Sequence, residues 1–201
     1  MQNNLIERKQ YMQMLRNLKD QNFIKVISGV RRCGKSTLLQ MFANELLLNG
    51  VDSLQIQFLN FEDLDTITIG DIFQVHTHIK NNLVPDKMNY IFLDEVQTVT
   101  DFQRLVDSLF IKKNCDVYIT GSNAYLLSGE LATLLTGRYI EISILPLQFT
   151  EYYDFTNTFS PNLSKIETLA NFLQEGGIPE YLKQKKISQK QADEFVRSVL
   201  N

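Results

Sequence analysis

The fold is decided by Gly29-Val30-Arg31-Arg32-Cys33-Gly34-Lys35-Ser36-Thr37, whose spacing is that of the Walker A phosphate-binding loop, G-x-x-x-x-G-K-S. Residues 23–28 before it form a short β-favouring run. Residues 38–47 after it repeat apolar side chains at helical spacing. Strand, glycine loop and helix form the context that this motif requires, so the stretch predicts a nucleotide site.

Each residue type in the loop has a physical reason to be there. Gly29 and Gly34 let the backbone turn and present N–H groups to phosphate oxygens at a helix N-terminus. Lys35 can neutralise the β and γ phosphates, and the hydroxyl of Ser36 can bind Mg²⁺. The expected nucleotide-binding residues are therefore Gly29, Arg31, Arg32, Cys33, Gly34, Lys35, Ser36 and Thr37.

A second motif follows a continuous apolar run. Residues 89–93 predict a central strand buried on both faces, and Asp94 and Glu95 end it. A carboxylate at the tip of a buried strand is costly unless it is paired or binds a metal. This is the Walker B pattern, in which we expect Asp94 to hold Mg²⁺ beside Ser36 and Glu95 to activate the attacking water.

Two further strands carry polar or charged residues at their ends. Residues 117–120 predict a strand followed by Ser122 and Asn123, which suit contact with the γ-phosphate or the water. Helix capping is an equally good interpretation of either residue alone. Residues 139–144 predict a fifth strand, and Arg138 precedes it.

The rest of the chain predicts the surrounding elements. We expect an amphipathic helix at 5–19, an edge strand at 53–60, a helix at 71–82 and another helix opened by a capping box at Thr100 and Gln103. Beyond residue 147 the composition changes, with helices expected at 149–155, 163–174, 180–185 and 191–200 and a linker at 156–161. The sequence therefore predicts two parts, an ATPase domain at 1–147 and a helical lid or the start of a C-terminal region at 148–201.

Composition limits the class of protein. The 201 residues carry a net charge of −3, which gives no global electrostatic case for nucleic acid or an acidic membrane. No apolar run approaches the ~20 residues of a membrane span. Two cysteines make no disulfide framework, and His76 and His78 lie on opposite sides of a helix, which makes them a poor pair of metal ligands. We expect a cytoplasmic protein.

Taken together, the motifs resemble one family, the prokaryotic AAA-type ATPases close to the archaeal ATPase group. The resemblance rests on residues 29–37, 93–97, 120–124, 135–138, 145–152 and 176–180. It implies an α/β P-loop NTPase sandwich with a parallel five-stranded sheet in the order 5-1-4-3-2. Members commonly continue into a C-terminal domain, so we expect the chain to be a fragment or a shortened relative.

The resemblance also assigns roles to two residues. Arg138 would be a finger that enters the site of a neighbouring subunit in a homo-oligomer, although a structural pair with a local carboxylate such as Glu141 is an alternative. Asn60, at the tip of strand 53–60, would hold Glu95 away from water, although it could simply cap a turn.

The leading function is Mg²⁺-dependent ATP hydrolysis coupled to a conformational change or to assembly with a partner, either protein or nucleic acid. A non-hydrolysing ATP-gated switch and a small-molecule kinase are the alternatives. Glu95 beside Asp94 favours hydrolysis over the kinase, because kinases of this fold rarely carry a water-activating glutamate there.

Overall fold

In the computed structural model, the described residues are 6, 8–121, 135–159, 162–179 and 181. They form two compact units. One contains residues 10–29 and 35–143, and the other contains residues 1–9, 30–34 and 144–201. The predicted boundary between residues 147 and 148 stays a prediction, and each unit is described by itself.

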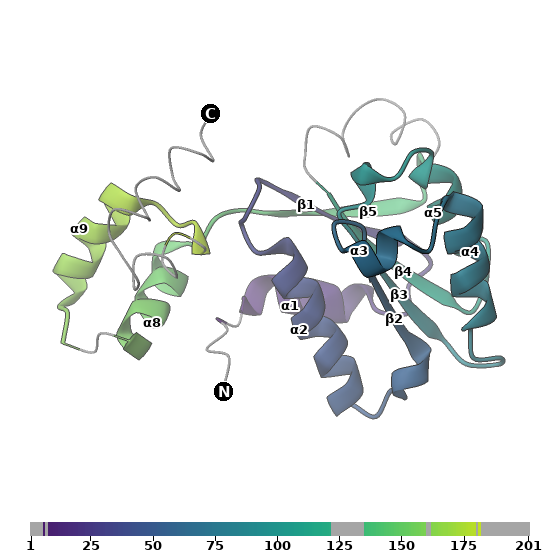
Figure 1. The fold of residues 1–201 in the computed structure, drawn as a ribbon. Coiled ribbons are helices and arrows are strands. Elements are labelled where there is room, and N and C mark those ends of the chain that lie inside the picture. Colours follow the sequence, from purple (N-terminus) through teal and green to yellow (C-terminus); the bar gives the residue numbers. More distant parts are fainter. Residues whose placement is uncertain (1–5, 7, 122–134, 160–161, 180, 182–201) are drawn as a thin grey trace. The chain divides into compact units, whose positions relative to one another are not determined.

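The first unit is built on a five-stranded parallel sheet in the order β2-β3-β4-β1-β5 (Figure 1). This order confirms the sequence-based expectation. The strands are β1 (Ile24–Gly29), β2 (Ile56–Asn60), β3 (Asn89–Asp94), β4 (Cys115–Thr120) and β5 (Tyr139–Ile144).

Burial follows the position of each strand in the sheet. All six residues of β1 and of β3 are buried. The continuous apolar run at 89–93 predicted this burial for β3, whereas β1 was predicted only as a short β-favouring run. In β2 only Leu59 is buried, because this strand lies at the edge. The alternation that predicts an edge strand at 53–60 is confirmed, but the strand itself begins at Ile56, after a 3₁₀ turn at Ser53–Gln55.

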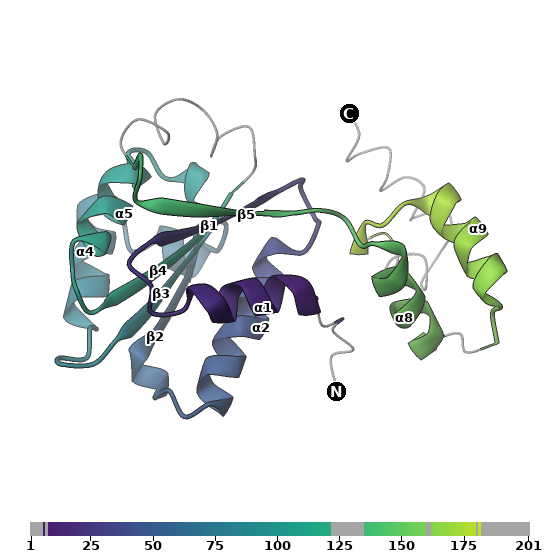
Figure 2. The ribbon, with the colours of Figure 1, turned by 180° about the vertical axis from the view of Figure 1, so that it is seen from behind.

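Helices cover both faces of the sheet, which gives three layers. Helices α4 (Ile72–Asn81) and α5 (Phe102–Phe110) pack on one face, where their apolar side chains share a core with those of β1 to β4. Helices α1 (Lys9–Leu18) and α2 (Lys35–Leu48) lie together on the opposite side of the sheet (Figures 1 and 2). The ring of Phe42 on α2 packs against those of Phe92 and Tyr118.

The residues at the start of each helix show whether a side chain caps it. Asp71 caps α4, and its carboxylate accepts hydrogen bonds from the backbone N–H groups of Phe73 and Gln74. The capping box predicted at Thr100 is wrong. Asp101 precedes α5 with a left-handed φ of 59°, and no side chain caps this helix. A one-turn helix, α3 (Leu64–Ile67), lies in the acidic stretch between β2 and α4.

The amino-terminal end of the sheet contains a buried ion pair. The ammonium of Lys25 contacts the carboxylate of Asp116, and both side chains are almost fully buried. Lys25 also donates to the backbone oxygen of Gln21 at 2.7 Å, and Asp116 accepts from Asp20 N and Tyr118 OH. The buried charges are therefore paired and hydrogen-bonded, as their burial requires.

The second unit contains α8 (Phe149–Phe159) and α9 (Lys165–Glu175). The motifs at residues 145–152 and 176–180 contact each other in this unit. Leu147 N donates to Gly177 O at 2.6 Å, and a Cβ on Gly177 would lie 2.2 Å from Leu147 O. The linker predicted from residue 156 is partly wrong, since α8 continues to Phe159. The helices predicted at 180–185 and 191–200 lie outside the described residues apart from Tyr181.

Candidate functional site

The candidate site of the first unit lies at the carboxyl edge of the sheet. Gly29 ends β1, Asp94 ends β3 and Thr120 ends β4. Because the strands are parallel and adjacent, these three ends meet at one edge. Helix α2 begins at Lys35, one short loop after β1.

Asp94 is the centre of this edge and is fully buried. Its Oδ1 accepts hydrogen bonds from Ser36 Oγ at 3.0 Å and from Thr120 Oγ1. Its Oδ2 is buried and has no partner among the described residues. Burial raises the pKa of the Asp94 carboxyl, because the loss of water outweighs the hydrogen bonds from Thr120 and Ser36.

This geometry fits a magnesium ion. Mg²⁺ prefers oxygen ligands and is commonly held by one or two protein groups together with substrate phosphates. Asp94 Oδ2 and Ser36 Oγ are such oxygens, and the orphaned Oδ2 would gain a partner. In the described part of the chain no three His, Cys, Asp or Glu side chains form a metal cluster, so an ion here would rely on few protein ligands.

Lys35 is the buried cation of the site, with 4% of its surface exposed. Its Nζ lies 3.3 Å from Gly29 O and 3.7 Å from Glu95 Oε1. The first turn of α2 thereby brings a positive charge next to the Walker B carboxylates.

Glu95 follows Asp94 in a left-handed conformation, with φ 56° and ψ 48°. Its backbone N–H donates to Thr120 Oγ1 at 2.9 Å, which fixes the turn. Its Oε2 accepts a hydrogen bond of 2.6 Å from Gln97 Nε2. Left-handed backbone is uncommon for a residue other than glycine and is concentrated at functional sites.

Sequence reasoning missed Thr120 and Gln97. Thr120 is the last residue of the predicted strand 117–120. Its hydroxyl could have been identified as a site group, because the last residue of this strand faces the site. Gln97 was quoted only as part of the family motif. Its spacing of two from Glu95 carries no information until the 3₁₀ turn η2 (Val96–Thr98) brings the amide back to the carboxylate.

Residues 30–34 form the loop itself and belong to the second unit. Arg31 and Arg32 are exposed, whereas Cys33 is buried. Arg32 and Gly34 have positive φ angles of 66° and 99°, so the loop needs left-handed backbone at both positions. Thr37, the last predicted nucleotide-binding residue, is half-buried on α2.

Arg8 holds this loop within the second unit, and nothing in the sequence pointed to it. Its guanidinium donates to Cys33 O at 3.2 Å and to Leu145 O at 2.9 Å. It also pairs with both carboxylate oxygens of Glu151 on α8, at 3.0 and 3.1 Å. One buried side chain thus joins the phosphate-binding loop to the start of the helical segment.

The structure places Arg138 away from the site of its own chain. Its backbone oxygen accepts from Ile24 N at the start of β1, whereas the site lies at the end of that strand, roughly 17 Å along it. Its side chain pairs with a carboxylate, as the structural alternative expected, but the partner is Asp107 on α5 and not Glu141. Glu141 instead accepts from Ser28 Oγ.

Of the three remaining predicted residues, the structure describes only Asn60. Asn60 pairs in register with Asp94, but its Oδ1 accepts from Glu62 N at 2.9 Å, which is the turn-capping alternative. Ser122 and Asn123 lie outside the described residues.

Comparison with known proteins matches residues 21–153 to the AAA domain family. A protein of Haemophilus influenzae is 42% identical over 176 residues, which cover 87% of this chain and 44% of that protein. The Methanocaldococcus jannaschii protein MJ1544 is 34% identical over 171 residues, covering 79% of this chain and 36% of its own length. Both relatives are described as uncharacterised, and the chain spans less than half of either.

Solved structures share the fold at low sequence identity. The Saccharomyces cerevisiae Hsp104:casein complex superposes with a TM-score of 0.59 at 13% identity, covering 86% of this chain and 31% of that one. A Walker-type ATPase of Pyrococcus abyssi superposes with a TM-score of 0.54 at 18% identity, covering 90% and 66%. With the family match over most of the sheet, these findings identify the chain as a member of the AAA domain family, with an AAA-type P-loop ATPase fold.

Proposed function

We propose that this domain binds ATP with Mg²⁺ and hydrolyses the bond between the β and γ phosphates. The observation that carries the proposal is the buried Asp94, which is hydrogen-bonded to Ser36 and Thr120 and leaves Oδ2 without a partner beside the Lys35–Glu95 pair. Membership of the AAA domain family supports the same assignment.

Different residues of the site would carry out different parts of phosphoryl transfer. Backbone N–H groups of loop 30–34 and the Nζ of Lys35 would hold the phosphates. Asp94 and Ser36 would hold Mg²⁺, which when bound neutralises charge on the phosphate oxygens. Glu95 would take a proton from water as its oxygen attacks the γ phosphorus, the bond to the bridging oxygen breaks, and ADP and phosphate leave.

Phosphate release by the purified protein, compared between wild type and Glu95→Gln, tests the proposal. The amide keeps the shape of the side chain but cannot act as a base. We expect unchanged ATP binding and turnover lower by about 10²–10⁴-fold. Equal turnover of the two proteins would remove Glu95 from the chemistry.

A non-hydrolysing switch is the second candidate, and one observation favours it. Both carboxylate oxygens of Glu95 have neighbours, with Lys35 at one and Gln97 at the other, which competes with contact to water. Under this alternative the wild type would bind ATP with the same dependence on Lys35 but release no phosphate above the Glu95→Gln level.

Arg138 would complete the site of a neighbouring subunit. Its side chain is 46% exposed and pairs with Asp107 at the surface, where such a pair is weak enough to exchange for a phosphate. Hydrolysis per subunit should then rise with protein concentration, and Arg138→Ala should lose turnover by up to about 10³–10⁵-fold while binding ATP normally.

Mixing two inactive variants tests this directly. In a mixture of Arg138→Ala and Lys35→Ala, ATP bound to the first variant would face the intact Arg138 of the second. Recovered activity supports the shared site. Absent recovery with confirmed mixed assembly, or activity independent of concentration, would overturn it.

We also propose that hydrolysis drives a conformational or assembly change in a partner protein or nucleic acid. The chain spans less than half the length of each relative, so this coupling is proposed for the whole protein and not for the domain alone. Among the described residues no helix is long and apolar enough to cross a bilayer.

A further inference from the structure

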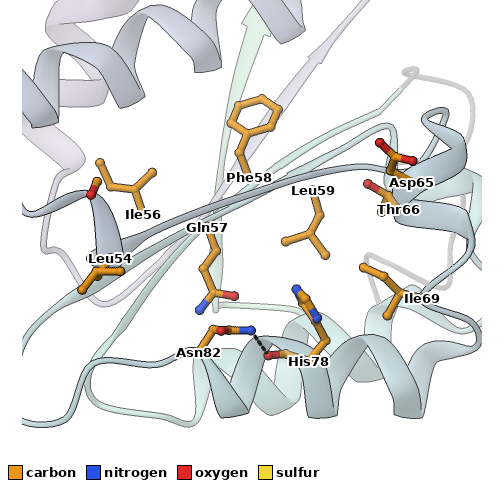
Figure 3. A pocket seen from close by; sticks show the side chains of 11 residues that line it. Leu54, Ile56, Gln57, Phe58, Leu59, Asp65, Thr66, Ile69, His78 and Asn82 are labelled. Atoms are coloured by element: carbon orange, nitrogen blue, oxygen red, sulfur yellow. Dashed lines mark hydrogen bonds between the residues drawn. The ribbon is translucent and has the colours of Figure 1, made fainter.

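A hollow of about 450 Å³ lies along the edge strand β2, outside the candidate ATP site. Its walls come from β2, α3 and α4 (Figure 3). Gln57 and Phe58 point to opposite sides of the strand, yet both line the hollow. The hollow therefore follows the outer edge of β2, where the sheet formed by the described residues ends.

The polar side chains in this hollow offer hydrogen-bond acceptors. Gln57 Nε2 donates to Ile79 O at 3.1 Å, whereas its Oε1 is buried without a partner in the described chain. Asn82 Nδ2 donates to His78 O at 2.8 Å, which leaves the amide oxygen as an acceptor (Figure 3). A buried acceptor without a donor is costly, so a ligand that brings a donor would relieve it.

Acidic residues lie in the hollow and near both ends of β2. Asp65 lines the hollow, and Glu62 and Asp63 precede it in the turn after β2. Asp52 lies just before the strand. None of the residues that line the hollow in the described chain is a lysine or an arginine. A cationic side chain is therefore the donor that this site would favour.

The edge of β2 also suits an extended backbone. An edge strand presents unpaired N–H and C=O groups, and peptides bind such edges by adding a strand, with pockets that take alternate side chains. Leu54 at the rim and Leu64 on α3 are 70% and 74% exposed, which gives apolar contacts for the other side chains.

We propose that the edge of β2 binds an extended, basic segment of a partner protein, with a lysine or arginine side chain that donates to Gln57 Oε1. This surface is separate from the nucleotide site and does not depend on ATP hydrolysis. It is nevertheless one strand away from Asp94, because Asn60 of β2 pairs in register with that residue.

Selection from a displayed library of random twelve-residue peptides tests the proposal. Bound peptides should share apolar residues at alternate positions and at least one lysine or arginine. The best peptide, made with a fluorescent label, is then titrated against wild type, Gln57→Met and Gln55→Met. Gln55 is the matched control, since its amide donates to Met88 O at 2.6 Å and does not line the hollow.

We expect Gln57→Met to weaken peptide binding by about tenfold and Gln55→Met to leave it unchanged, because only the first removes the orphaned acceptor. Methionine in place of the basic residue of the peptide should weaken binding by about ten- to a hundredfold. This second measurement uses wild-type protein and stands even if Gln57→Met folds poorly.

Methylation of peptide nitrogens separates strand addition from side-chain capture. Methyl groups on one set of alternate residues should abolish binding, and those on the other set should not, because an added strand pairs only alternate N–H groups with β2. Three results would each overturn the proposal. The selected peptides could lack a basic residue, both glutamine variants could lose peptide affinity equally, or methylation could leave binding unchanged.

Discussion

The ammonium of Lys35 lies 3.7 Å from the carboxylate of Glu95, and the side chains are 3% and 14% exposed. The cation of the Walker A motif and the proposed base of the Walker B motif are thus a single ion pair. A change at either residue alters the electrostatic environment of the other, so binding and turnover must be measured separately in each variant.

Lys35→Ala should abolish ATP binding or weaken it severely, since it removes the fixed positive charge over the phosphates. Titration with a labelled ATP analogue measures this. Lys80→Ala, at an exposed position on α4, is the matched control and should bind like wild type. Unchanged affinity in Lys35→Ala would refute the Walker A assignment.

Ser36→Ala should reduce ATP affinity in the presence of Mg²⁺ more than in its absence. The hydroxyl bonds to Asp94 at 3.0 Å and would become a metal ligand, but it contributes little charge toward the phosphates. Titrations with Mg²⁺ and with EDTA give the two affinities. Equal losses under both conditions would contradict the metal role.

Gln97→Met should lower kcat by about tenfold with little change in KM. The amide of Gln97 orients the Glu95 carboxylate through a 2.6 Å hydrogen bond, and a base that is not oriented by a third group works less well. Steady-state phosphate release separates the two constants. Gln40→Met, exposed on α2, controls for the substitution itself. A rise in KM alone would point to a role in binding instead.

Asp94→Asn and Asp116→Asn should change stability in opposite directions. Asp94 has an unpartnered buried oxygen, so the removal of its charge should raise Tm by about 2–5 °C. Asp116 pairs with Lys25, and its loss leaves a buried cation at a cost of about 3–5 kcal/mol. Thermal unfolding of both variants at pH 7.5 measures the contrast, and a lower Tm for Asp94→Asn would contradict it.

His76 predicts a pH dependence of stability. Burial lowers the pKa of its imidazole from 6.5, and Lys112 and Lys80 lower it further. Below pH 6.5 the unfolded chain takes up a proton that the folded state resists, so stability falls as the pH falls. His76→Gln should therefore lose about 1–2 °C less in Tm than wild type between pH 7.5 and 5.5, a small effect because the site is partly exposed. Identical losses would refute this.

The elements were predictable where one local rule decides the structure. The continuous apolar run at 89–93 predicted the buried central strand β3, and the alternation at 53–60 predicted β2 at the edge. The local sequence was misleading at residues 156–159, where polar residues suggested a linker although α8 continues to Phe159. Thr156 and Thr158 each donate to the backbone oxygen four residues earlier, at 2.8 and 2.9 Å, which satisfies their hydroxyls inside α8.

The partners of side chains were harder to predict than the elements. The alternative to a finger for Arg138 was a structural pair with a local carboxylate such as Glu141, and the observed pair is with a carboxylate farther away in the sequence. The pair with Asp107 depends on α5 passing the start of β5, which no local pattern encodes. Arg8 is the same case, since its contacts join residues up to 143 positions apart.

The Lys25–Asp116 ion pair implies that missense variants of this protein divide into two genetic classes. A change at this end of the sheet lowers the amount of folded protein in a cell, because about 1–2 kcal/mol already alters abundance several-fold. Under the proposed function, a change at Glu95 would instead leave normal amounts of folded protein that binds ATP without turning it over.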